Sequence, residues 1–192
     1  MDIRKQIEAY VPYNEQEEVD KKAILQCMET CEDVLTRENL IAHFTASCWI
    51  VNKERTKVLM IYHNIMDSWA WTGGHADGED NLLAVALREA QEETGLTKIR
   101  PVSEEFYSIE VLPVFSHIKR GAFVNAHVHL NVSYLLEADE AEPIRVKEDE
   151  NSAIRWVDLE QAPRLAKEEE DRILYQKLND KLNGYLSQKK QC

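Results

Sequence analysis

The sequence predicts an α/β fold in which a mixed sheet carries helices on both faces, preceded by a helical extension. Stretches typical of strands occur both before and after a strong central helix pattern, and a long amphipathic helix pattern closes the chain. Elements in this order typically pack as helices on the two faces of one sheet. The length of 192 residues suits one domain with an added segment. We expect residues 1–42 to be the helical extension and residues 43–192 to be the core domain.

The first expected elements are helical. Asn14 with Glu17 resembles a capping box, with asparagine in place of serine or threonine, so a helix should follow to about Cys31. A second short helix is expected over residues 33–40. The apolar stripe of the first helix is expected to consist of residues at helical spacing: Val19, Ala23, Cys27 and Cys31, with Ile24 and Met28 beside it.

The strand region is expected to begin at His43. The segments FTASCWIV and KVLMIYH predict two strands of a hairpin, and SWAW predicts a short third strand before the pair Gly73–Gly74. A helix should run from about Asp80 to Thr94 and end at Gly95, a residue that favours helix termination. The remaining expected elements are strands near 98–102, 105–116, 123–137 and 153–158, a helical turn at 159–165 and an amphipathic helix over 166–187.

Composition limits the partners. The formal net charge of −12 repels a polyphosphate backbone, so no nucleic-acid polymer is expected as a partner. No segment reaches the ~20 consecutive apolar residues that a membrane helix needs, and the first residues lack the apolar region of a signal peptide. The four cysteines show no zinc-site spacing. We expect a cytoplasmic protein with reduced cysteines and no membrane partner, and a homodimer is compatible with these properties.

The predicted central helix carries a group of carboxylates. Glu89, Glu92 and Glu93 fall within an arc of about 100°, beside the apolar stripe rather than opposite it. Three carboxylates at the edge of a core need a compensating cation, and hard oxygen ligands favour Mg²⁺ or Mn²⁺. Arg88 flanks them and is placed to orient a carboxylate. A solvated surface helix rich in glutamate is the alternative interpretation of the helix alone.

The stretch Gly74–Leu96 resembles the Nudix box, G-x5-E-x7-R-E-U-x-E-E-x-G-U with U an apolar residue. Two positions depart from the pattern: Asp80 stands in place of the motif glutamate, next to Glu79, and Ala90 replaces a larger aliphatic residue. The positions in register are Gly74, Arg88, Glu89, Glu92, Glu93, Gly95 and Leu96.

The resemblance implies a Nudix-type α/β/α sandwich and a pyrophosphohydrolase. The expected reaction is metal-dependent hydrolysis of a diphosphate linkage in a small nucleoside diphosphate derivative, assisted by Mg²⁺ or Mn²⁺. The family pattern carries the roles over to this chain: Glu89, Glu92 and Glu93 as metal ligands and catalytic residues, with Arg88 in the same group. The carbonyl of Gly73 would be a further ligand. Glu150 is the candidate for a distal acidic ligand, its alternative being an exposed acidic loop.

Four other residues are candidates for substrate binding. His127 and His129 alternate with apolar residues, which places them on the polar face of a predicted strand. His75 follows the glycine pair, and Trp69 lies on a strand that leads toward it. The alternatives are side chains bonded to one another in the sheet for the two histidines, a turn-stabilising role for His75 and core packing for Trp69.

The substrate class has several alternatives. ADP-ribose or a nucleotide sugar is favoured because the helical extension could enclose a second moiety, and Pro113 lies near the place where ADP-ribose hydrolases carry a proline. A nucleoside or deoxynucleoside triphosphate pyrophosphohydrolase is the second candidate. Isopentenyl-diphosphate isomerase would need a cysteine where Gly73 stands, and a non-catalytic ligand-sensing Nudix domain would not need all three glutamates.

Overall fold

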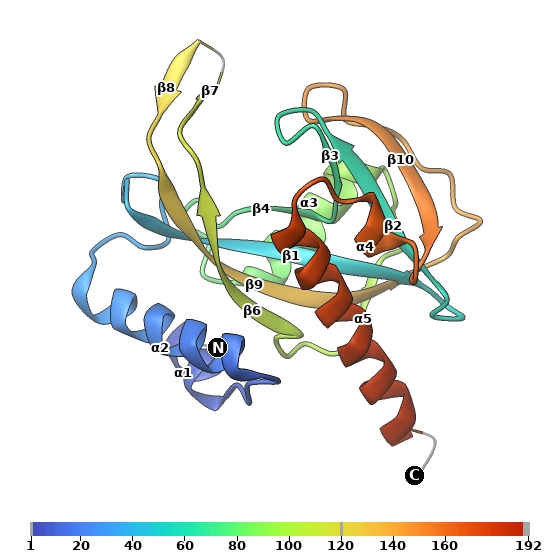
Figure 1. The fold of residues 1–192 in the computed structure, drawn as a ribbon, viewed down its shortest axis with the longest axis horizontal. Coiled ribbons are helices and arrows are strands. Elements are labelled where there is room, and N and C mark those ends of the chain that lie inside the picture. Colours follow the sequence, from blue (N-terminus) through green and yellow to red (C-terminus); the bar gives the residue numbers. More distant parts are fainter. Residues whose placement is uncertain (1, 120, 190–192) are drawn as a thin grey trace. The chain divides into compact units, whose positions relative to one another are not determined.

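The computed structural model describes residues 2–119 and 121–189 (Figure 1). The chain divides into two compact units, each built from three segments that alternate along the sequence. Unit 1 contains Met1–Ser47, Gly73–Leu87 and Ser103–Tyr134, and unit 2 contains Cys48–Thr72, Arg88–Val102 and Leu135–Cys192. Four elements have residues in both units: strands β1 (Ala42–Asn52), β4 (Thr72–His75) and β9 (His127–Ala138), and helix α3 (Leu82–Thr94).

Unit 1 begins with helices α1 (Ile3–Ala9) and α2 (Glu15–Thr30), and α2 packs on strand β6 (Ser108–Val114), as Figure 1 shows. The predicted cap of α2 is confirmed, because the Asn14 side chain accepts a hydrogen bond from the Glu17 N–H. The predicted apolar stripe is wrong at Val19, which is 56% exposed, whereas Ile24, expected beside the stripe, is fully buried. Glu17 is also fully buried, because it accepts hydrogen bonds from Tyr10, Tyr13 and Ser108.

Two other expectations for the N-terminal segment differ from the structure. Residues 33–40 form turns rather than a helix. Asp33 there has a left-handed φ of 54°, and the Asn39 side chain accepts from the N–H groups of Ile41 and Ala42. These local hydrogen bonds replace those of a helix. Helix α1 was not predicted, although Asp2 caps it by accepting from the Arg4 N–H.

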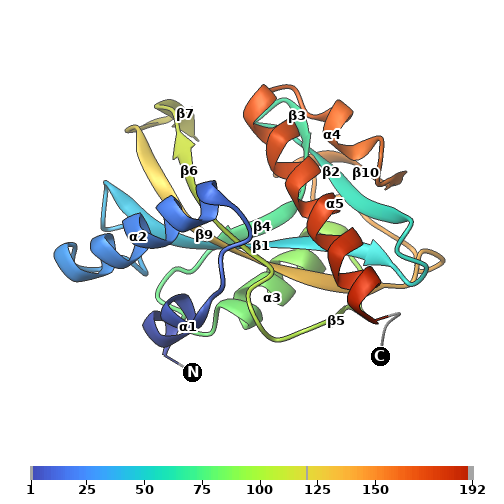
Figure 2. The same cartoon turned by 60° about the horizontal axis from the view of Figure 1, so that its bottom comes forward.

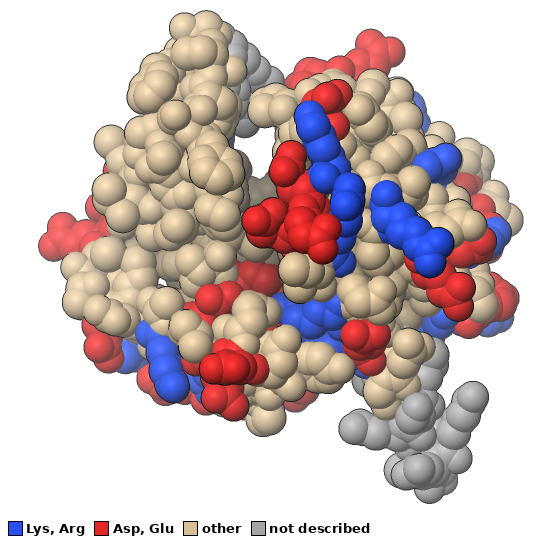
Figure 3. All heavy atoms as spheres, viewed as in Figure 1, with Lys and Arg blue, Asp and Glu red and all other residues tan. Residues whose placement is uncertain are grey.

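The strands of unit 1 lie around the first half of β1. That half lies between β4 (Thr72–His75) and β9, and β6 pairs antiparallel with β9 from Ser108↔Ser133 to Val114↔His127. Beyond β6 and β9 the chain forms an unpredicted hairpin of β7 (His117–Lys119) and β8 (Ala122–Val124), visible in Figure 1. Phe115, Ile118 and Phe123 are exposed on this hairpin arm, and the described atoms on the face of the arm that Figure 3 shows belong to residues other than Lys, Arg, Asp and Glu.

Unit 2 is centred on β2 (Lys57–His63). This strand pairs antiparallel with β1, β3 (Ser68–Ala70) and β10 (Asn151–Asp158), and β5 (Arg100–Pro101) pairs with the end of β9. Helices α4 (Ala162–Leu165) and α5 (Glu169–Lys189) lie against each other, as Figure 2 shows. Helix α5 buries residues spaced along one face: Leu174, Tyr175, Leu178 and Leu182. The predicted amphipathic helix is therefore confirmed.

Helix α3 starts and ends as its sequence predicts. The Asn81 side chain accepts from the Ala84 N–H at its start, and Gly95 has the left-handed φ of 73° that favours glycine at its end. The apolar stripe of α3 is fully buried: Leu82, Val85, Ala86 and Ala90. The α/β class, the mixed sheet and the N-terminal helices are confirmed. Among the described residues, no helix has the length and apolar character needed to cross a membrane.

Candidate functional site

The carboxylates of α3 extend from the core of unit 2 to its surface. Glu93 is 3% exposed, while the side chains of Glu89 and Glu92 are 17% and 48% exposed. Because Ala90 beside them is fully buried, the three carboxylates occupy the edge of the apolar stripe, where the sequence predicts them. A charged group at such an edge loses hydration and requires a partner.

The pKa of Glu89 reflects its position at the edge of the core. Burial raises the pKa of the Glu89 carboxyl, and the neighbouring charge of Glu92 raises it further. Lys147 and Arg88 act in the opposite direction, and the guanidinium of Arg88 lies 3.7 Å from the Glu89 carboxylate. Arg88 is thus the positive flank that the sequence suggests.

Lys147 joins Glu150 to this group. Its ammonium lies 3.0 Å from a carboxylate oxygen of Glu92 and 3.0 Å from one of Glu150. Although burial lowers the pKa of Lys147, its hydrogen bonds to the two carboxylates raise it well above its ordinary value. A positive charge between Glu92 and Glu150 is therefore stabilised by the protein.

The sequence analysis did not single out Lys147. Its spacing of three residues from Glu150 is a signal that could have indicated an ion pair between the two side chains.

The side chain of Asn151 ties this loop to the helix. The Asn151 amide donates to the carbonyl of Glu93 at 3.1 Å, and its side-chain oxygen accepts from the Lys147 N–H at 3.2 Å. Asn151 is fully buried at the start of β10. These bonds hold Lys147 and Glu150 against the end of α3, and sequence reasoning missed the asparagine.

Gly73 lies in β4, within unit 1. A Cβ atom at this position would come within 2.7 Å of the Ala46 carbonyl oxygen and of the Ser47 Cα. These are backbone atoms that cannot move aside, so the close approach of β4 to β1 requires glycine here. The role of the Gly73 carbonyl as a metal ligand remains a prediction. On the following loop, Glu79 accepts from the Asn81 N–H at 2.9 Å, next to Asp80.

The three predicted histidines meet in unit 1, together with a fourth. The rings of His75, His127 and His129 lie with that of His43 at centroid separations between 4.8 and 5.2 Å. His43 is 4% exposed, and burial lowers its pKa, although the hydrogen bond to the Asn39 carbonyl opposes this effect. Sequence reasoning did not include His43 among the site residues, because its contacts with His75, His127 and His129 join segments far apart in the sequence.

The polar face of β9 has two parts: the histidines at its start and a network of hydrogen bonds further along the strand. In the network, Asn131 donates to Glu110 at 2.8 Å and accepts from Thr45 and Ser47 at 3.0 and 2.8 Å. Asn131 and Glu110 are buried. This part of the face is therefore a network of side chains that bond to one another, which was the alternative interpretation of the polar alternation.

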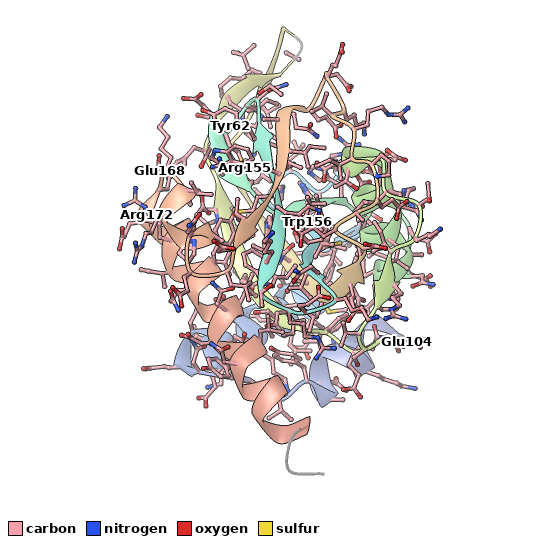
Figure 4. The ribbon with its side chains drawn as sticks, turned by 90° about the vertical axis from the view of Figure 1, so that its right-hand side faces the viewer. Tyr62, Glu104, Arg155, Trp156, Glu168 and Arg172 are labelled. Carbon is pink, nitrogen blue, oxygen red and sulfur yellow. The ribbon has the colours of Figure 1, made fainter. Side chains whose placement is uncertain are left out.

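Trp69 packs within unit 2. The guanidinium of Arg155 lies 4.3 Å above its ring, and Tyr62 meets it edge-on at a centroid separation of 5.6 Å. Figure 4 shows Arg155 and Tyr62 side by side on β10 and β2. One face of the indole is therefore covered, and a base that stacks on Trp69 must use the other face or displace Arg155. The substrate role of Trp69 remains a prediction.

Comparison with known proteins decides the family. The family model of the NUDIX domain matches residues 42–178. The chain belongs to the NUDIX domain family. The resemblance recognised at Gly74–Leu96 is thereby confirmed. Among curated proteins, none matches the chain.

Solved structures similar to this chain share the NUDIX fold. An Ap4A hydrolase of C. elegans, in a binary complex, is 20% identical, with 77% of this chain and 98% of that chain covered and a TM-score of 0.55. The E. coli dihydroneopterin triphosphate pyrophosphohydrolase is 18% identical, with 70% and 92% covered and a TM-score of 0.52. The Nudix hydrolase RenU of M. smegmatis is 17% identical, with 72% and 84% covered and a TM-score of 0.51.

Proposed function

We propose that this chain is a pyrophosphohydrolase that cleaves the diphosphate linkage of a small nucleoside diphosphate derivative, with ADP-ribose or a nucleotide sugar preferred. The observation that carries the proposal is the group of Glu89, Glu92 and Glu93 at the edge of the core, on the helix that holds the family's motif. Membership of the NUDIX family supports the assignment as an enzyme of this type.

The residues present fit a divalent cation. The side-chain donors are all carboxylate oxygens, which Mg²⁺ and Mn²⁺ prefer, and the Lys147 ammonium between Glu92 and Glu150 marks a position where positive charge is favourable. Glu89, Glu92, Glu93 and Glu150, all in unit 2, would hold the ion. When bound, such an ion neutralises the charge that develops on phosphoryl oxygens.

The protein's own residues have separate tasks in this proposal. Glu89 or Glu93 would act as, or position, the general base that takes a proton from the attacking water. Arg88 orients the Glu89 carboxylate, which lies 3.7 Å from its guanidinium. His75, His127 and His129 are candidates for contact with the substrate phosphates.

The substrate preference rests on the helical segment, residues 1–42, at the N-terminal side of the NUDIX match. Helix α2 packs on β6, and the preference follows from the expectation that residues 1–42 enclose a second moiety attached to the diphosphate. A triphosphate needs less enclosure beyond its base. Because similar structures include an Ap4A hydrolase and a dihydroneopterin triphosphate pyrophosphohydrolase, nucleotides with longer phosphate chains are the second candidate class.

The test is a comparison of kcat/KM for ADP-ribose, UDP-glucose, Ap4A, dGTP and 8-oxo-dGTP at the same Mg²⁺ concentration. We expect ADP-ribose or UDP-glucose to lead. A lead of more than about tenfold for the triphosphates, a barrier difference of ~1.4 kcal/mol, would show that the preference is wrong while leaving the hydrolase assignment in place.

The same assay tests the site. Glu93→Gln should reduce kcat by at least about tenfold, through loss of at least ~1.4 kcal/mol of transition-state stabilisation. The exposed Glu168, which Figure 4 shows beside Arg172, provides the matched control Glu168→Gln. The proposal fails if the folded protein cleaves none of these compounds with Mg²⁺ or Mn²⁺, or if Glu92→Gln and Glu93→Gln both retain full activity.

A further inference from the structure

Four of the six histidines of the chain converge in unit 1. His43 lies on β1, His75 on the neighbouring β4, and His127 and His129 on the neighbouring β9. One ring nitrogen from each of His43, His75 and His129 lies within 4.8 Å of the others. Within residues 2–119 and 121–189, this is the one group in which three metal-ligating side chains come so close. Such convergence of imidazoles from three strands points to a shared ligand.

The orientation of His43 provides independent evidence. Its Nδ1 lies 3.1 Å from the Asn39 carbonyl oxygen. Because a carbonyl only accepts hydrogen bonds, Nδ1 carries the proton and Nε2 presents a lone pair. This Nε2 atom is buried and has no hydrogen-bond partner in the described part of the chain. A buried polar atom without a partner destabilises the folded state, and a cation bound at Nε2 would remove that penalty.

His127 repeats the first part of this arrangement. Its Nδ1 lies 2.9 Å from the Asn125 carbonyl oxygen, so its Nε2 presents a lone pair, which accepts the hydrogen bond that joins it to the His129 Nε2 at 3.3 Å. An ion bound by both rings would take the place of that hydrogen bond. Two imidazole nitrogens on one tetrahedral Zn²⁺, each at about 2.0–2.1 Å, are separated by about 3.3 Å. A second ring nitrogen that donates to a backbone carbonyl is also usual for histidines that bind metals.

We propose that His43, His75, His127 and His129 form a binding site for a Zn²⁺ ion. The site contains none of the carboxylates of α3, and its donors select a different class of ion. Neutral imidazoles suit Zn²⁺, whereas Mg²⁺ favours oxygen ligands. The ion would link β1, β4 and β9 within unit 1, and it would stabilise the folded protein because it binds only where the three strands are assembled.

The binding experiment uses the full chain after dialysis against a chelator. Zn²⁺ is titrated calorimetrically in the presence of excess Mg²⁺, and the zinc content is measured after gel filtration. We expect one tightly held Zn²⁺ per chain and a higher melting temperature with Zn²⁺ than without it. Co²⁺ in place of Zn²⁺ should give the intense visible absorption of a tetrahedral site rather than the weak absorption of an octahedral one.

Variants separate this site from other zinc ligands. His43→Ala and His129→Ala should each weaken Zn²⁺ binding by at least about tenfold, since changes to partners of metal ligands already have effects of this size. His117→Ala is the matched control, because His117 also lies in unit 1 with its Nδ1 2.9 Å from a carbonyl oxygen, that of Phe115. It should bind Zn²⁺ like the unchanged protein.

Circular dichroism establishes that each variant is folded, and His75→Gln replaces any variant that is not. Glu93→Gln should leave Zn²⁺ binding unchanged, whatever its effect on hydrolysis, so failure of this proposal is distinguishable from failure of the proposed function. The proposal is overturned if the chain retains no Zn²⁺, if His43→Ala and His129→Ala bind it as well as His117→Ala does, or if Glu93→Gln abolishes binding.

Discussion

At the scale of single residues, Lys147 lies between two of the carboxylates proposed to hold a divalent cation. Its ammonium lies 3.0 Å from Glu92 and from Glu150 and repels any second cation placed between them. Lys147→Met removes that charge, so the Mg²⁺ concentration that gives half-maximal activity should fall. A partly exposed ion pair contributes up to about 1 kcal/mol, which corresponds to a decrease of up to about fivefold. The measurement is the Mg²⁺ dependence of turnover at saturating substrate.

Lys167→Met is the control for this prediction. Lys167 also pairs with a carboxylate, that of Asp67 at 3.2 Å, but on exposed side chains away from the acidic group of α3. The Mg²⁺ dependence of Lys167→Met should match that of the unchanged protein. A rise in the Mg²⁺ requirement of Lys147→Met would mean that Lys147 orders the carboxylates for the metal instead of competing with it.

Some residues of the candidate site can be predicted from the sequence, and others cannot. Glu89, Glu92 and Glu93 can be predicted because helical geometry alone brings them together. Lys147 and His43 cannot, because each meets its partners through contacts between segments far apart in the sequence. Local spacing predicts local neighbours, so the ligands contributed by distant loops and strands require the structure.

At the scale of elements, the packing of α2 depends on one buried carboxylate. Glu17 accepts hydrogen bonds from the Tyr10 hydroxyl at 2.6 Å, the Tyr13 N–H at 2.7 Å and the Ser108 hydroxyl at 2.8 Å. It thereby joins α2 to the segment before it and to β6. Glu17→Ala removes the shared acceptor and leaves a cavity, so we expect a loss of about 3 kcal/mol in the free energy of unfolding.

Urea denaturation measures this loss as a lower midpoint with an unchanged slope. Glu18→Ala is the matched control, since it makes the same change at the exposed neighbouring position and should alter stability by less than about 0.5 kcal/mol. If both variants have the same midpoint, α2 is not held by Glu17.

The errors in predicting elements have the same physical origin. Helix α2 was expected to bury Val19, but the face that contacts β6 is chosen by the polar partners of Glu17 rather than by the number of apolar residues. Residues 33–40 have a composition that allows a helix, yet the side chain of Asn39 stabilises turns there. Strongly periodic segments, such as α3 and α5, were predicted well because packing and local preference agree in them.

At the scale of the whole molecule, the fold class could be predicted because the order of strands and helices restricts the architecture. The division into two units could not, because each unit is assembled from three separate segments. The boundary expected between residues 42 and 43 falls one residue after the start of β1 and of the family match, both at residue 42. Whether residues 1–42 act as a separate extension remains a prediction.

The charge of the whole chain leads to the last prediction. There are 35 acidic and 23 basic residues. A protein binds a nucleic-acid polymer well when many of its basic side chains neutralise phosphates and release the counterions of those phosphates. Fluorescently labelled single-stranded and double-stranded DNA should therefore show no rise in anisotropy with this protein. Low salt with a chelator present is the most demanding condition, since attraction between charges is screened least there and no divalent ion can bridge the two anions. Polylysine should bind both probes and so show that the assay detects complexes. Saturable binding that weakens as salt is added would mean that a local basic surface outweighs the net charge, and nucleic-acid polymers would then return as candidate partners.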